Sequence, residues 1–208
     1  MSSLALVFVG AVLLVNGLVF LGPVSPRAAI PANLLVGALI VTTSLLGAVP
    51  AALDDRMALF GALGFCVFGF TYLTVAVSTL TDADGSGVAW YCGWAAVISA
   101  VLAVVNFSES DPRLAWLWVS WVVLFAAFFL AGVTGSARFG RGAGAISAIQ
   151  SVTTGTIPGL LMMNGDWADF SVTVIAVVQL LGIAAYLAII AMPAAPSPEV
   201  TAGAAHAE

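Results

Sequence analysis

The chain has 208 residues, of which 62% are apolar and only 7% are charged, and its formal net charge is −5. A soluble domain normally carries about a quarter charged residues, so these side chains cannot cover a water-soluble globule, and one compact membrane domain is predicted. The sequence has no lysine and no basic run, which excludes nucleic acid as a partner.

Seven apolar segments are long enough to cross a bilayer as helices, for which about 20 residues suffice. In chain order they cover residues 4–22, 29–49, 57–79, 88–106, 113–134, 143–163 and 170–192. The connections are short and hold nearly all the proline, aspartate and arginine, so consecutive helices should run antiparallel. Residues 1–192 are therefore predicted to form one all-α transmembrane domain, followed by a disordered tail over residues 193–208.

The arginines predict the orientation of these spans, because loops on the cytoplasmic side carry an excess of positive charge. Arg27, Arg138 and Arg141 lie in odd-numbered loops, whereas Arg56 and Arg113 lie in even-numbered ones. This distribution predicts an N-terminus outside the cell and a cytoplasmic C-terminus.

Charged residues are absent from the interior of every predicted span. Pumps and ion-coupled transporters usually keep Asp, Glu or His there, a retinal protein needs a lysine, and a membrane hydrolase needs an activated nucleophile or a metal. Cys66 and Cys92 are isolated in apolar segments without the spacing of a metal site or disulfide scaffold. The sequence thus predicts no catalytic, metal or cofactor site, and it favours a pore or carrier for small neutral molecules, or a structural bundle.

Aromatic residues are prominent in the third and fifth spans. Trp118, Trp121 and Phe125 are three and four residues apart and share one helix face, as do Phe68 and Tyr72. Two such faces turned toward each other would form a narrow slot that admits a thin planar molecule. The same spacing is more often typical of residues that pack helices together, and in-span Ser, Thr, Asn and Gln commonly pair helices.

Six segments resemble, in order and with matching spacing, the AmiS/UreI family of urea and short-chain amide channels. They are LVFVGAVLLVNGL, SPRAAIPANLLVGAL, FGFTYL, AWYCGW, LWVSWVVLFAAF and AIQSVTTGTIPGLL, within residues 3–163. The resemblance implies six pore-forming helices, built as a helical hairpin repeated three times, in a passive channel of a bacterial plasma membrane. It also implies a homo-hexamer around a plug of membrane lipid. The urea or amide taken up through the channel would then supply a cytoplasmic amidase or urease.

Carried over position by position, the resemblance implies a pore lined by aliphatic and aromatic side chains with a few polar ones. These residues are Leu6, Val9, Leu13, Asn16, Phe68, Tyr72, Trp118, Trp121, Leu124, Phe125 and Gln150. Asn16 and Tyr72 would offer hydrogen bonds near a constriction.

Two positions differ from the acid-activated member of the family. That member has a tryptophan at the position of Phe125 and a glutamate at the position of Gln150. The second and fourth loops are short and contain no histidine, the side chain whose charge switches near pH 6, so we predict a channel that is not gated by acid. The span at 170–192 resembles an addition found in amide-associated members, and we expect it outside the pore-forming helices. The alternatives are a proton-coupled transporter of small amides and a non-conducting structural or sensory membrane subunit.

Overall fold

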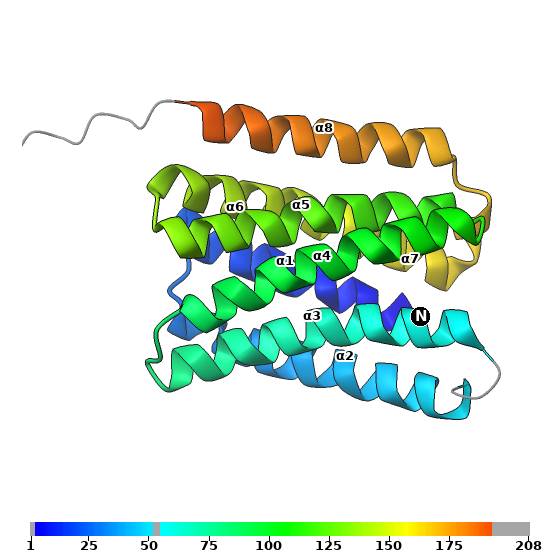
Figure 1. Ribbon diagram of the computed structural model, residues 1–208, viewed down its shortest axis with the longest axis horizontal. Helices are drawn as coiled ribbons and strands as arrows, with labels where there is room; N and C mark the ends of the chain where they lie inside the picture. The colour runs from blue at the N-terminus through cyan, green and yellow to red at the C-terminus, as the bar shows by residue number, and fades with distance from the viewer. Residues whose placement is uncertain (1–2, 52–54, 193–208) are drawn as a thin grey trace, which may run out of the picture.

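The structure is a computed structural model that describes residues 3–51 and 55–192, and this part of the chain contains only helices and connections (Figure 1). Its helices are α1 (Ser3–Leu21), α2 (Ile30–Ala51), α3 (Arg56–Leu80), α4 (Ser86–Ser108), α5 (Pro112–Thr134), α6 (Ala137–Gln150), α7 (Ile157–Asn164) and α8 (Val172–Ala191). Short 3-10 turns precede α2 and α8, at Arg27–Ala29 (η1) and Asp166–Ala168 (η3). The predicted tail at residues 193–208 lies outside the described residues.

Polar residues in the connections determine where several helices begin. Asp111 precedes α5 and its carboxylate accepts a hydrogen bond from the backbone N–H of Leu114 at 3.1 Å, while Pro112 occupies the first helical position. Asp55 caps α3 in the same way, through the N–H of Ala58 at 2.9 Å. Such caps satisfy backbone donors that the first helical turn leaves free.

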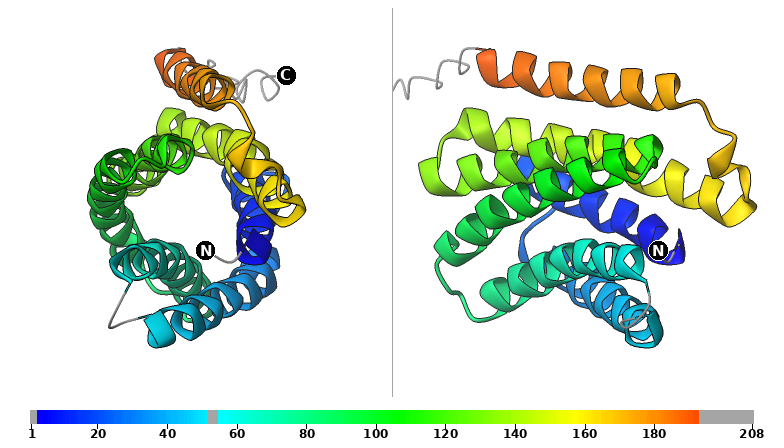
Figure 2. Two further views of the ribbon diagram at one scale, coloured as in Figure 1. Left: turned by 90° about the vertical axis from the view of Figure 1, so that its right-hand side faces the viewer. Right: turned by 45° about the vertical axis from the view of Figure 1, so that its right-hand side comes forward.

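The helices form a ring, seen end-on in the left view of Figure 2. Around it, α1, α2, α3, α4, α5 and α6 each contact the next, and α6 closes the circle against α1. The most closely packed neighbours are α2 with α3, α4 with α5, and α1 with α6. Helix α8 lies outside the ring and packs on α5 and α6 (Figures 1 and 2). The predicted all-α bundle of six helices, with a further C-terminal helix outside it, is therefore confirmed.

Six helices in the described part of the chain are long and apolar enough to cross a membrane, namely Ser3–Leu21, Arg27–Ala48, Arg56–Leu80, Ser86–Ser108, Pro112–Thr134 and Val172–Ala191. The span expected at 143–163 differs from the others, because it is not one regular helix. It belongs to a helical run in which α6 passes directly into a π-helical segment, η2 (Ser151–Thr156), and then into α7.

The π segment packs closely against α1. A Cβ atom on Gly155 would lie 2.5 Å from the Cα of Gly10, and one on Gly10 would lie 2.6 Å from the carbonyl oxygen of Ser151. Glycine at both positions therefore lets the two backbones touch, as small residues do at membrane helix interfaces. This contact holds the wider turn of the π segment against the middle of α1.

Candidate functional site

Two cavities open at opposite ends of the ring. The first, here called the Arg27 cavity, has a volume of about 760 Å³ and includes Leu13, Asn16, Phe20, Arg27, Phe68, Thr71, Tyr72, Thr79, Asp82, Cys92, Leu124, Phe125 and Phe128 in its lining. The second, the Trp167 cavity, has a volume of about 730 Å³ and includes Ser3, Ser44, Asp55, Phe60, Phe65, Asn106, Asp111, Leu114, Trp118, Met162 and Trp167. Neighbouring helices run in opposite directions, so these two groups of residues lie toward the two ends of the bundle.

An aromatic cluster, formed by Phe68, Tyr72, Trp118, Trp121 and Phe125, separates the two cavities. The Phe68 ring lies edge-on to Trp121 with 4.9 Å between ring centroids, and it lies at 4.9 Å from Phe125 as well. Trp118 meets Trp121 in a T-shaped contact at 4.6 Å. Phe68 and Phe125 line the Arg27 cavity and Trp118 lines the Trp167 cavity, so the aromatic cluster lies between the two cavities.

Helix α1 supplies an aliphatic surface in the same region. Leu6, Val9 and Leu13 are each at most 2% exposed. Leu13 and, from α5, Leu124 line the Arg27 cavity, while Leu6 and Val9 line neither cavity and are buried in the apolar core with the aromatic cluster. Their part in forming a pore stays a prediction.

Polar groups from α5 and η2 form a small network behind the rings. The indole Nε1 of Trp121 donates to Thr154 Oγ1 at 3.0 Å, and that hydroxyl donates to the carbonyl oxygen of Gln150 at 2.8 Å. The side-chain nitrogen of Gln150 donates to the carbonyl of Ser120 at 2.9 Å. Trp121 is thus held in one orientation by a side chain of the π segment, a partner that its sequence pattern did not indicate.

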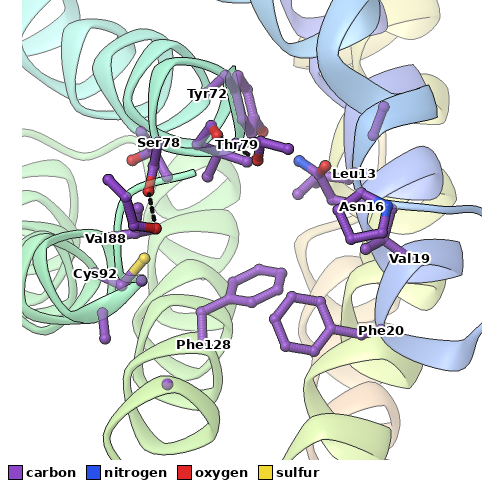
Figure 3. A pocket seen from close by; sticks show the side chains of 18 of the residues that line it. Leu13, Asn16, Val19, Phe20, Tyr72, Ser78, Thr79, Val88, Cys92 and Phe128 are labelled. Atoms are coloured by element: carbon purple, nitrogen blue, oxygen red, sulfur yellow. Dashed lines mark hydrogen bonds between the residues drawn. The ribbon is translucent and has the colours of Figure 1, made fainter. Parts of the chain in front are cut away.

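Two buried polar atoms, one in the aromatic cluster and one in the network behind it, have no hydrogen-bond partner in the described part of the chain. The hydroxyl of Tyr72 and the side-chain oxygen Oε1 of Gln150 are buried and have no partner among the described protein atoms. A buried polar atom without a partner costs free energy, and it gains most when a small polar molecule reaches it. Tyr72 also lines the Arg27 cavity (Figure 3).

Asn16, expected to offer hydrogen bonds near a constriction, is already engaged. Its amide nitrogen donates to Asn33 Oδ1 at 2.9 Å, and Asn33 Nδ2 donates back to Asn16 Oδ1 at 2.8 Å and to the carbonyl of Ala29 at 3.0 Å. An amide has two N–H donors and two acceptor lone pairs, so Asn16 retains one of each toward the Arg27 cavity that it lines (Figure 3).

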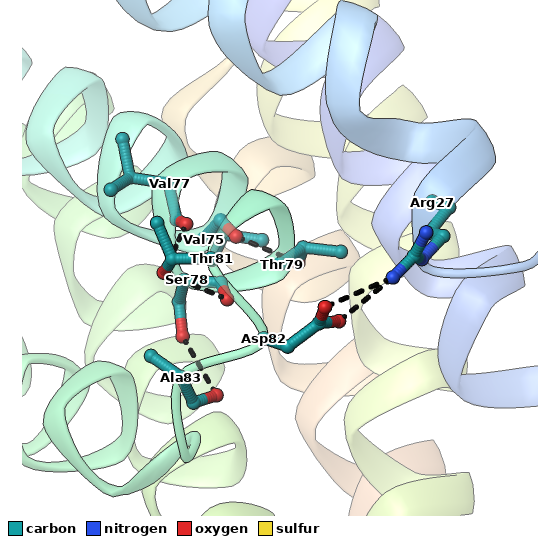
Figure 4. A network of polar contacts seen from close by, with 8 residues as sticks. All are labelled: Arg27, Val75, Val77, Ser78, Thr79, Thr81, Asp82 and Ala83. Carbon is teal, nitrogen blue, oxygen red and sulfur yellow. Dashed lines mark hydrogen bonds and ion pairs between the residues drawn. The ribbon is translucent and has the colours of Figure 1, made fainter.

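An ion pair lies in the lining of the Arg27 cavity, toward the loops. Arg27 Nη2 contacts both carboxylate oxygens of Asp82, at 2.9 and 3.1 Å, and so joins η1 to the connection between α3 and α4 (Figure 4). Both side chains are 73% exposed. They place balanced charge at this end of the bundle and none beside the aromatic cluster. Among residues 3–51 and 55–192, no cluster of His, Cys, Asp or Glu could hold a metal ion.

Comparison with known proteins agrees with this geometry. The profile of the AmiS/UreI family transporters matches residues 1–166, which is most of the chain. The chain belongs to the AmiS/UreI family. It is 35% identical over 186 residues to an amidate-substrate transporter of Mycolicibacterium smegmatis, covering 89% of this chain and 86% of that protein. It is also 26% identical to the acid-activated urea channel of Helicobacter pylori strain J99, over 80% of this chain and all of that protein.

A solved structure matches the ring itself. The crystal structure of the Helicobacter pylori urea channel superposes with a TM-score of 0.71 at 24% identity, over 80% of this chain and 99% of that one. This similarity supports the fold. The present AmiS/UreI chain is therefore a multi-pass membrane protein of a family of transporters and channels, and α8 lies beyond the residues that the family profile matches.

Proposed function

We propose that this protein is a passive channel for urea and short-chain amides such as acetamide. The observation that supports the proposal most directly is the aromatic cluster between the two cavities, with neutral polar atoms of Tyr72 and Gln150 beside it and no charge. Planar amides can pass flat against ring faces. The Tyr72 hydroxyl can donate to a carbonyl oxygen, and Gln150 Oε1 can accept from an N–H group.

The absence of charge beside the aromatic cluster also favours an uncharged solute. In the α-helices of the described residues the charged side chains are Arg56, Arg113, Arg138 and Arg141, all within the first five residues of their helix. Arg27 and Asp166 lie on the short 3-10 turns that precede α2 and α8. An ion entering the ring would lose its hydration without a compensating charge. A proton-coupled mechanism would require an ionisable group within the spans, so passive conduction is the simpler proposal.

The relatives support the same class of solute. One is named for amidate substrates and another for urea. Urea and short primary amides share a planar carbonyl with an NH₂ group, and this shared chemistry is what the two free polar atoms can recognise. By resemblance we further propose a homo-hexamer around a lipid plug, a cytoplasmic C-terminus, and a supply of substrate to an amidase or urease.

Light scattering of proteoliposomes tests the proposal. Vesicles that contain the purified protein should shrink and re-swell faster than empty vesicles in urea or acetamide gradients, and should show no comparable gain for glycerol. Flux that saturates and stops when the proton gradient is collapsed would indicate a coupled transporter instead. Permeability equal to that of empty vesicles for both solutes would support a non-conducting subunit and overturn the proposal.

A further inference from the structure

Helix α8 brings one strongly polar, buried side chain to the outside of the ring. Gln179 is 2% exposed and lies in the middle of a helix that is otherwise mostly apolar. Its side-chain nitrogen donates to the carbonyl oxygen of Thr153, in the π segment, at 3.2 Å. This is a contact between the helix added outside the ring and the segment that supplies Thr154 to the aromatic cluster.

The carbonyl of Thr153 lacks its backbone donor for a reason visible in the sequence. In a π-helix each N–H bonds to the carbonyl five residues earlier, and the N–H of Ile157 does bond to the carbonyl of Val152. The next donor in this register would be residue 158, which would bond to Thr153. Residue 158 is proline, which has no N–H. Gln179 therefore supplies a hydrogen bond that the backbone cannot make.

Adjacent residues of the π segment connect this bond to the rings. Thr153 is held by Gln179, and the next residue, Thr154, accepts the hydrogen bond from the Trp121 indole at 3.0 Å. On its other side the segment is fixed against Gly10 of α1. The segment thus lies between α1 and α8, and its position sets where the Trp121 ring is anchored.

We propose that Gln179 is a positioning residue, through which α8 sets the orientation of Trp121 and hence the selectivity of the constriction. The side chain acts through the Thr153 carbonyl and the Thr154 hydroxyl and does not touch the permeating solute. The part of this inference that concerns selectivity rests on the proposed function, whereas the part that concerns ring orientation does not.

Substitution of Gln179 with an apolar residue tests ring orientation directly. Gln179→Leu removes the donor, and Gln179→Met, which preserves the length of the side chain, serves if the leucine variant folds poorly. Tyr186→Phe is the matched control, because Tyr186 lies on the same helix, is 4% exposed, and has a hydroxyl without a partner among the described atoms. Nitrogen-15 NMR of indole groups, with Trp121 assigned through Trp121→Phe, should show a shifted Trp121 Nε1–H signal in the Gln179 variants only. An unchanged signal would overturn the proposal.

Flux measurements then test the consequence for selectivity. The ratio of acetamide to urea permeability should change by about threefold in Gln179→Leu, the effect expected of one interhelical hydrogen bond in a membrane. A purely structural role would lower both permeabilities together and leave their ratio fixed. Thr154→Val should change the ratio too, and adding Gln179→Leu to it should have no further effect; independent effects would contradict the path through Thr154. Wild-type vesicles without excess urea and acetamide flux would refute the proposed function, while the NMR result would still decide the role of Gln179.

Discussion

The side-chain amides of Asn16 and Asn33 donate hydrogen bonds to each other, at 2.9 and 2.8 Å, and join α1 to α2 beside the Arg27 cavity. Both side chains are buried, with exposures of 9% and 0%. Asn33 lines neither cavity, and in hydrocarbon its amide has no water as an alternative partner. The pair therefore closes the ring between two helices that pack less extensively than their other neighbours.

Removing one amide of this pair should cost more stability than removing both. Asn16→Leu leaves Oδ1 of the fully buried Asn33 without its donor, and we expect it to lower the free energy of unfolding by about 1 kcal/mol. The double variant Asn16→Leu/Asn33→Leu should recover part of this loss, because no unpaired amide remains. Thermal unfolding in detergent measures both. A double variant that is less stable than the single one would argue against the pairing.

The Phe68 ring should set the width of the passage, because it contacts four rings of the aromatic cluster. Phe68→Ala removes it, and we expect permeability to a bulkier amide such as butyramide to rise severalfold relative to urea. Phe107→Ala is the matched control, since Phe107 is 45% exposed, lies outside both cavity linings and packs on Trp116. If the two variants, at matched amounts of folded protein, have equal ratios of butyramide to urea permeability, Phe68 only packs the helices and does not set the width.

Helical spacing was sufficient to predict the aromatic faces but not their hydrogen-bonding partners. Residues three and four apart share a helix face whatever the tertiary structure, and the third and fifth spans do meet through Phe68 and Trp121. The bond from Trp121 to Thr154 depends on how far α5 and η2 are shifted along each other. Asn16 can pair with Asn33 only if the two residues lie at the same depth in the bundle. The only sequence signal for this is that both lie close to the same loop.

The sequence pattern also did not predict the π segment that interrupts the span at 143–163. Pro158 is visible, but a proline within an apolar helix usually indicates a kink or an end. Whether it accompanies a π segment depends on tertiary contacts, here the approach of Gly10 to Gly155 and the donor from Gln179. Hydropathy is averaged over a whole span, so it does not detect a local change from α-helical to π-helical hydrogen bonding.

Urea flux should depend little on pH between 7.5 and 5. The only histidine is His206, near the end of the chain, and histidine is the side chain whose charge ordinarily changes in this range. Near the Arg27 cavity, the hydroxyl and the backbone N–H of Ser86 donate to the carboxylate of Asp84 and lower its pKa. Asp84 therefore stays ionised at pH 5, and its contribution to the start of α4 is lost only below the usual aspartate pKa of about 3.9.

Proteoliposome flux at the two pH values checks this expectation. We expect a change of less than about twofold, because no switching charge faces the route. The acid-activated urea channel of Helicobacter pylori, reconstituted in parallel, is the positive control. A tenfold rise at pH 5 would refute the absence of acid gating, and His206→Ala would then show whether the tail is responsible.

Cys92 gives the protein a native reporter of the Arg27 cavity. Its thiol lies among the lining residues on α4, across the cavity from Asn16 and Leu13 (Figure 3). Thiols are soft ligands that bind mercury(II) tightly, and a metal held there would narrow the approach to Phe125. Mercury(II) chloride should therefore reduce urea flux in the wild type.

The other cysteine supplies the control. Cys66 lies outside both cavity linings, so Cys66→Ser should remain sensitive to mercury whereas Cys92→Ser should become resistant. Inhibition that persists in Cys92→Ser but is lost in Cys66→Ser would assign the mercury effect to Cys66 and contradict the role of Cys92 as the reporter.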